Sequence, residues 1–137
     1  MIGIVLATHG RLGEEMLQTL AGVLGPVPRI EAISAMEGDP EAVKAKIHRA
    51  LERLDGGDGV LILTDMLGDT ATNLSLTVAR SEGAEVVAGV NMPMLIKAVS
   101  SRDTMKLRDL AGFIRQYGRE HIFWASEHGQ PPDGVRR

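Results

Sequence analysis

IGIVLATHG, residues 2–10, is the stretch that decides the fold class. It is a near-continuous apolar run that stops at the polar turn THG, residues 8–10, and such a run is typical of a strand buried on both faces of a sheet. Residues 11–24 then carry apolar side chains at helical spacing, and a Gly-Pro pair at 25–26 stops the pattern. The sequence therefore predicts a buried strand followed directly by a helix.

The same alternation of apolar runs and helical periods continues along the chain. Strands are predicted at 2–7, 30–35, 60–63 and 84–90, and helices at 11–24, 40–54, 70–81, 93–99 and 104–117. Strands that alternate with such helices are typical of βαβ units, which build a mainly parallel sheet with right-handed crossovers. The strand order is then flavodoxin-like or Rossmann-like. In both orders ligands bind at the carboxyl ends of the strands beside the first one.

The aromatic residues all lie in one short segment near the C-terminus. The 137 residues are 44% apolar, yet only Phe113, Tyr117, Phe123 and Trp124 are aromatic. The main core is therefore expected to be aliphatic, which suits a parallel sheet covered by helices. Residues 120–124 are β-prone, so a short last strand is expected there. On composition alone, the aromatic segment is either a small local core or an interface.

Several classes of protein are excluded by composition. The chain has no cysteine, so cysteine nucleophiles and thiolate metal sites are ruled out. With 15 basic and 18 acidic residues and a net charge of −3, it has no basic stripe for nucleic acid or membrane. We find no signal peptide and no apolar run near the roughly 18 residues of a membrane span, so a cytoplasmic protein is expected. Nucleotide-binding glycine loops and HExxH spacing are also missing, so no cofactor and no metal are expected.

His9 and Asp65 are the main candidates for chemistry. They follow the first and third predicted strands, and in flavodoxin-like order these strands are neighbours, so the two side chains should converge. Asp65 could accept the Nδ1–H of His9 and leave the Nε2 lone pair free as a nucleophile, which suits phosphoryl transfer. Backbone N–H groups of residues 66–70 and the hydroxyls of Thr70 and Thr8 could then contact phosphoryl oxygens.

Each of these residues also has a purely structural interpretation. His9 could cap backbone groups at the strand end, and Asp65 could hold its loop. Asp69 precedes the helix predicted at 70–81, so we expect it to be the helix N-cap rather than a catalytic acid. The other histidines, His48, His121 and His128, are expected to be solvated.

Four sequence blocks together resemble a known family. They are residues 2–10, residues 63–68 (LTDMLG), Asn73 and residues 90–95 (VNMPML). In order and spacing they are similar to the IIA component of the mannose family of the bacterial phosphotransferase system. The likeness extends from about residue 2 to residue 124.

The resemblance implies a fold, an activity and partners. The fold would be flavodoxin-like, with four parallel strands and a short antiparallel C-terminal strand exchanged between the subunits of a homodimer. The domain would span residues 1–125, and residues 126–137 would form a polar, mobile tail. HPr would phosphorylate His9 on Nε2, and His9 would pass the group to a separate IIB protein, with Asp65 orienting the ring. The phosphoryl-binding residues would be Thr8, Gly10, Met66, Leu67, Gly68, Asp69 and Thr70.

One segment departs from the family pattern. Where the family usually reads Gly-Gly-Ser/Thr-Pro, this chain has Gly68, Asp69, Thr70 and Ala71. A carboxylate added beside a dianionic phosphoryl group should disfavour the phosphorylated state, unless Asp69 turns outward as a cap. With no IIB domain in the sequence, the carrier would act in trans, in sugar uptake or in regulation.

Other functions fit parts of the pattern. A phosphotransfer subunit of a dihydroxyacetone kinase resembles this family in fold and histidine position, but the block at 90–95 favours the sugar branch. A receiver-like signalling domain would be phosphorylated on Asp65, although the acidic residues that hold its magnesium are replaced by residues 8–10. A metal chelatase lacks a second histidine in the crevice, and a histidine phosphatase lacks an arginine before His9.

Overall fold

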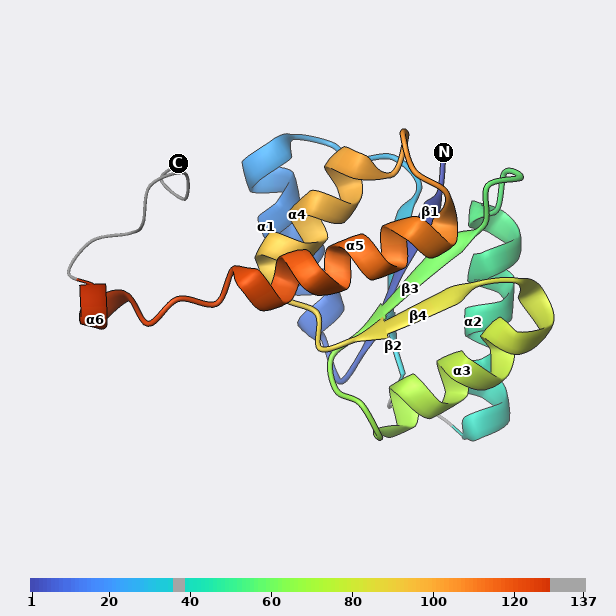
Figure 1. The fold of residues 1–137 in the computed structure, drawn as a ribbon. Coiled ribbons are helices and arrows are strands. Elements are labelled where there is room, and N and C mark those ends of the chain that lie inside the picture. The colour runs from blue at the N-terminus through green and yellow to red at the C-terminus, as the bar shows by residue number, and fades with distance from the viewer. Residues whose placement is uncertain (36–38, 129–137) are drawn as a thin grey trace.

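A four-stranded parallel sheet forms the centre of the molecule. The computed structural model describes residues 1–35 and 39–128. Its strands, in spatial order, are β2 (Ile30–Ser34), β1 (Gly3–Thr8), β3 (Val60–Thr64) and β4 (Glu85–Ala88) (Figure 1). This is the flavodoxin-like order, so the Rossmann-like alternative is excluded. The parallel register pairs Ala7 of β1 with Thr64 of β3, so the residues that follow these strands leave the same edge of the sheet side by side.

The predicted helices are all present; α2 has the predicted bounds, and the other four have ends shifted by one to three residues. They are α1 (Leu12–Leu24), α2 (Pro40–Leu54), α3 (Thr70–Glu82), α4 (Met92–Ser101) and α5 (Leu107–Glu120). Three of them begin at a side chain that accepts an N–H of the first turn, namely Asp39, Asp69 and Asn91. Within the described residues, no helix is both long enough and apolar enough to cross a membrane.

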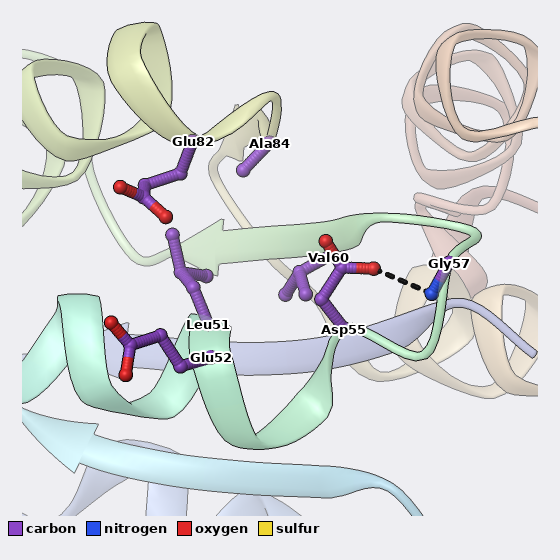
Figure 2. A pocket seen from close by; sticks show the side chains of 7 residues that line it. All are labelled: Leu51, Glu52, Asp55, Gly57, Val60, Glu82 and Ala84. Carbon is purple, nitrogen blue, oxygen red and sulfur yellow. Dashed lines mark hydrogen bonds between the residues drawn. The ribbon is translucent and has the colours of Figure 1, made fainter.

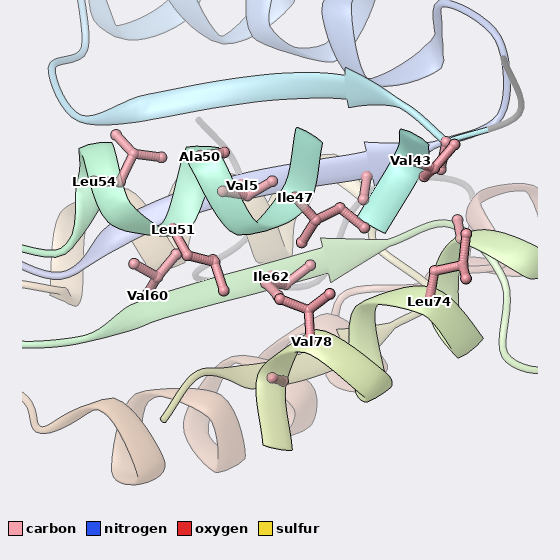
Figure 3. Packing of buried hydrophobic residues seen from close by; sticks show 14 residues of the cluster. Val5, Val43, Ile47, Ala50, Leu51, Leu54, Val60, Ile62, Leu74 and Val78 are labelled. Carbon is pink, nitrogen blue, oxygen red and sulfur yellow. The ribbon is translucent and has the colours of Figure 1, made fainter. Parts of the chain in front are cut away.

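Each face of the sheet has its own core, because side chains alternate along a strand. One face packs against α2 and α3, and Figure 3 shows Val5 and Ile62 among Ile47, Leu51 and Val78. The other face lies beneath α1, α4 and α5, and its central side chains are Ile4, Leu6, Leu61 and Leu63. The buried hydrophobic residues of the described chain are Ile, Leu, Val, Met and Ala, which confirms the aliphatic core expected from composition.

The chain after α5 differs from the prediction. A strand is expected at residues 120–124, but α5 continues to Glu120, so this residue is helical. Residues 121–124 form no strand in the described chain. They lead to a short helix, α6 (Ala125–His128), and Figure 1 shows this segment extending away from the body of the molecule. An exchanged strand requires a second subunit, so that part stays a prediction. Most of the predicted tail, residues 129–137, lies outside the described residues.

Candidate functional site

His9 and Asp65 meet at the carboxyl ends of β1 and β3. One carboxylate oxygen of Asp65, Oδ2, lies 2.9 Å from the ring Nδ1 of His9. The same oxygen accepts the backbone N–H of His9 at 3.1 Å. Because this one oxygen accepts both the backbone and the ring, the carboxylate fixes the position and the orientation of the imidazole together. The predicted convergence of these two residues is therefore present in the structure.

Asp69 reaches the same ring nitrogen from the start of α3. Its Oδ1 accepts the Thr72 N–H at 2.7 Å, so it is the N-cap, as predicted. Its Oδ2 lies 3.1 Å from Nδ1 of His9, so it caps the helix without turning outward. The two aspartate side chains are each 10% exposed, and within the described part of the chain Oδ1 of Asp65 and Oδ2 of Asp69 have no hydrogen-bond partner.

The single proton on Nδ1 cannot serve both aspartates. Hydrogen-bond geometry is met with Asp65, so Asp69 acts on the ring mainly through its charge. Partial burial raises the pKa of Asp65, but the hydrogen bonds to its carboxylate, led by those from the backbone and ring of His9, together outweigh this effect. The pKa of Asp65 therefore lies below its ordinary value, and the carboxyl is ionised at neutral pH.

The other ring nitrogen of His9 faces outward. No described residue makes a hydrogen bond to Nε2, and the side chain is 35% exposed. A proton held on Nδ1 leaves the lone pair on Nε2, which is the state of a nucleophilic imidazole. The arrangement is suited to accepting an electrophilic group from a partner that approaches the surface.

Within the described residues, one group of side chains lies close enough together to hold a metal ion. It consists of His9, Asp65 and Asp69, whose possible ligand atoms all lie within 4.8 Å of one another. We assign no metal ligands here, because Nδ1 makes a hydrogen bond to Asp65, and a ring nitrogen that carries a proton has no lone pair to offer a metal ion.

Comparison with known proteins identifies the family. The model of EIIA-man, described as the PTS system fructose IIA component, matches residues 3–114. The chain belongs to this family.

Individual members of the EIIA-man family agree with this assignment. The mannose-specific EIIAB component of Escherichia coli K12 is 35% identical over 88% of this chain, which spans 38% of that protein's length. The fructose-specific EIIA component of Bacillus subtilis 168 is 25% identical, covering 93% of this chain and 89% of the relative. These matches support a phosphotransferase component and do not favour the dihydroxyacetone kinase or receiver alternatives.

Solved EIIA structures share the fold. The phosphotransferase component EIIA from Streptococcus agalactiae superposes with a TM-score of 0.85 at 26% identity, over 93% of this chain and 99% of that one. The mannose/sorbose-specific IIA subunit from Enterococcus faecalis gives a TM-score of 0.80 at 26% identity, over 89% and 92% of the two chains.

The loop of residues 66–68 joins the two aspartates that contact His9. Met66 and Leu67 are 52% and 82% exposed, and Gly68 has a left-handed φ of 85° that favours glycine. Thr70 is the first residue of α3 and is exposed, and its N–H belongs to the first turn, which lacks acceptors within the helix. The phosphoryl-binding roles of these loop residues stay predictions.

Thr8 and Gly10 lie in the turn that presents His9. Thr8 is fully buried, and its hydroxyl accepts the Gly13 N–H at 2.8 Å, so it ties the strand to the start of α1. Gly10 is exposed with a left-handed φ of 48°. Their contact with a phosphoryl group also stays a prediction, and for Thr8 the structure gives the hydroxyl a different partner.

Sequence reasoning missed a pair of buried hydroxyls under the loop. Thr72 donates its hydroxyl to the Met66 carbonyl, so the Thr64 hydroxyl, 2.7 Å away, donates to Thr72. This chain of hydrogen bonds joins the end of β3 to the first turn of α3 and supports Asp65 and Asp69. The only signal in the sequence was a threonine three residues after the predicted cap.

A separate hollow lies at the opposite end of the strands. It lies between α2, the start of β3 and the end of α3 (Figure 2). Its volume is about 380 Å³. Its polar lining is acidic, from Glu52, Asp55 and Glu82. The ring of His48 lies 2.6 Å from Glu52 and 3.2 Å from Glu82, so it contacts acidic surface residues away from His9.

Proposed function

We propose that this protein is a phosphoryl carrier of the phosphoenolpyruvate-dependent sugar phosphotransferase system. It accepts the phosphoryl group from HPr on Nε2 of His9 and passes it to a histidine of a separate IIB protein. The observation that supports this most directly is the exposed Nε2 of a ring that Asp65 holds through Nδ1. The carrier serves sugar uptake or regulation, as a domain of residues 1–125 in the cytoplasm.

The surroundings of His9 fit a protein donor better than a small molecule. The nucleophile lies at the surface, and the exposed apolar side chains of Met66 and Leu67 lie in the loop beside it. Apolar side chains on an exposed loop are suited to a protein interface, where they lose contact with water. The proposed transfer breaks the P–N bond of the donor phosphohistidine and forms a P–N bond to Nε2, while the proton stays on Nδ1.

The test is incubation with labelled phosphoenolpyruvate, enzyme I and HPr. We expect label that is lost in acid and stable in alkali, the behaviour of phosphohistidine. His9→Ala should take up none, whereas His48→Ala, a histidine on the exposed side of α2, should be labelled like the unchanged protein. Label on His9→Ala, or label lost in alkali as for an aspartyl phosphate, would show that the nucleophile is a different residue.

We further propose a homodimer built through the C-terminal segment. β4 is an edge strand whose only neighbour among the described residues is β3. A groove of about 570 Å³ lies between β4 and α5, lined in part by Val86, Ala88 and Gly112. Ile122 and Trp124, in the extended segment after α5, are 74% and 69% exposed. A segment of this kind from a second subunit could pair with the open edge of β4.

A further inference from the structure

Asp69 gives this site a second carboxylate at the nitrogen that does not react. Its Oδ2 lies 3.1 Å from Nδ1 of His9, only slightly farther than the 2.9 Å of Asp65. The Asp69 side chain is nine-tenths buried, and that oxygen has no hydrogen-bond partner among the described residues. The other oxygen is committed to the cap of α3, so the carboxylate is held in place.

A negative charge at Nδ1 matters most after Nε2 has been phosphorylated. The phosphorylated ring is positively charged while Nδ1 keeps its proton and neutral once that proton is lost. When the phosphoryl group passes from the protonated ring to water or to an acceptor histidine, a new bond forms between phosphorus and the acceptor, the P–Nε2 bond breaks with its electron pair left on Nε2, and neutral imidazole is released. When it leaves the deprotonated ring, the leaving group is an imidazolate anion, which is far less stable. Protonation at Nδ1 therefore makes the phosphoryl group labile.

We propose that Asp69 is a positioning residue that holds the proton on Nδ1 of phosphorylated His9, so that the phosphoryl group is released from a protonated ring over a wider pH range. This inference rests on the proposed function, because it requires phosphorylation of His9 on Nε2. Asp65 binds the proton through its hydrogen bond, and Asp69 adds a second charge that keeps the proton there. The same charge repels the phosphoryl dianion, which also favours its release.

Among the described residues, Asp65 and Asp69 are the only charged groups in ion-pair contact with the ring. Asp65 follows β3 and Asp69 begins α3, and both approach the ring at Nδ1. On the α1 side, Arg11 is exposed and pairs with Glu14 and Glu15 of its own helix. The balance at Nδ1 is therefore set by two carboxylates, one of which stands where the family usually has glycine.

The experiment measures how long the phosphoryl group survives as a function of pH. Unchanged protein and Asp69→Ser are phosphorylated by HPr or, in a parallel arm, directly by phosphoramidate. The donor is removed, and loss of label is followed from about pH 5 to about pH 10, with the label on His9→Ala subtracted. Serine is a good N-cap, so Asp69→Ser removes the charge and keeps the helix start.

We expect the pH at which hydrolysis slows to be lower in Asp69→Ser by on the order of one pH unit, the effect of one nearby carboxylate on a partly exposed ring. At a pH halfway between the two midpoints, the variant should lose its label about threefold more slowly, and well above both midpoints about tenfold more slowly. Asp69→Ala should shift the profile in the same way, because it removes the same charge. Asp39→Ser, the matched change at the cap of α2, should leave the profile unchanged.

Three outcomes would contradict either the role of Asp69 or the proposed carrier function, and they can be told apart. Superimposable profiles of Asp69→Ser and the unchanged protein would overturn the role of Asp69. A shift in Asp69→Ala that is absent in Asp69→Ser would mean that the cap, and not the charge, controls the site. If HPr fails to label His9, the proposed function is wrong, and the phosphoramidate arm still decides whether Asp69 holds the proton.

Discussion

One carboxylate oxygen of Asp65 contacts both the backbone and the ring of His9, so this side chain controls the geometry of the site. Oδ2 receives the backbone N–H and the ring Nδ1 of His9, whereas Oδ1 is buried with no hydrogen-bond partner in the described part of the chain. Both contacts are stronger when the carboxylate that accepts them is ionised. The side chain that orients the nucleophile therefore also stabilises the turn that carries it.

The contribution of Asp65 to stability should depend on pH. Burial raises the pKa of Asp65, but the hydrogen bonds to its carboxylate, led by those from His9, together lower it more, so the folded value lies below the ordinary value of about 4. A lowered pKa gives stability that is present above the unfolded pKa and lost as the pH falls through the folded value. Asp65→Asn should therefore be less stable than the unchanged protein at neutral pH, and the difference should shrink below about pH 4.

Denaturant unfolding at several pH values measures this difference. Asp109→Asn, on the exposed first turn of α5, is the control and should change the free energy of unfolding by less than about 0.5 kcal/mol at any pH. A gap between Asp65→Asn and the unchanged protein that stays constant down to about pH 3 would contradict the lowered pKa.

The first turn of α3 and the end of β3 are held together by hydroxyls rather than by apolar contacts alone. Thr72 is 1% exposed and Thr64 is fully buried, so water cannot replace their hydrogen bonds. Through the Met66 carbonyl, the same chain of bonds fixes the loop between the two aspartates. The geometry at His9 therefore depends on the junction of these two elements.

Thr72→Val tests this junction, because it keeps the shape of the side chain and removes the hydroxyl. The Thr64 hydroxyl and the Met66 carbonyl would each lose a partner, which should lower the free energy of unfolding by about 1–3 kcal/mol. The measurement is the denaturant midpoint at unchanged slope. Thr77→Val, whose hydroxyl bonds Asn73 on the exposed side of the same helix, should cost less than about 0.5 kcal/mol. Equal losses in both variants would show that the buried pair contributes nothing specific.

Features encoded by residues that are neighbours in the sequence could be predicted. Contacts between residues far apart in the sequence could not. Apolar runs and caps gave the strands and the start of α3, because the residues that encode them are neighbours in sequence. The contact of Asp69 with the ring of His9 depends on how closely the start of α3 approaches the end of β1, and no local sequence pattern encodes that distance. Arg102 is 3% exposed, and its guanidinium donates to carbonyls of three residues far along the chain. The sequence around Arg102 does not predict its burial, because arginine side chains are normally exposed to solvent.

Two features of the described residues lack a covering element, and both adjoin α5. One is the open edge of β4 with its groove against α5, and the other is the aromatic segment. Phe113 and Tyr117 lie along α5, and His121 stacks on Tyr117 with ring centres 3.7 Å apart and meets Phe123 edge-on. Phe113, Phe123 and Trp124 are at least 38% exposed, so the four aromatic residues form no buried local core within this chain. Of the two interpretations that composition allowed, the interface is the one consistent with this exposure.

Paired substitutions in the full chain test this interface. Ile122 and Trp124 are two residues apart, so in a strand they lie on the same face, and Ile122→Glu with Trp124→Glu would bring two charges into the proposed contact. We expect the unchanged protein to sediment as a dimer and the double variant as a folded monomer, with unchanged far-ultraviolet circular dichroism. Val23→Glu, at a position on α1 that is 60% exposed, adds a charge elsewhere and should remain dimeric. A double variant that stays fully dimeric at low protein concentration would place the subunit contact on another surface. Because His9 and both aspartates belong to one chain, a monomeric variant should still be phosphorylated on His9.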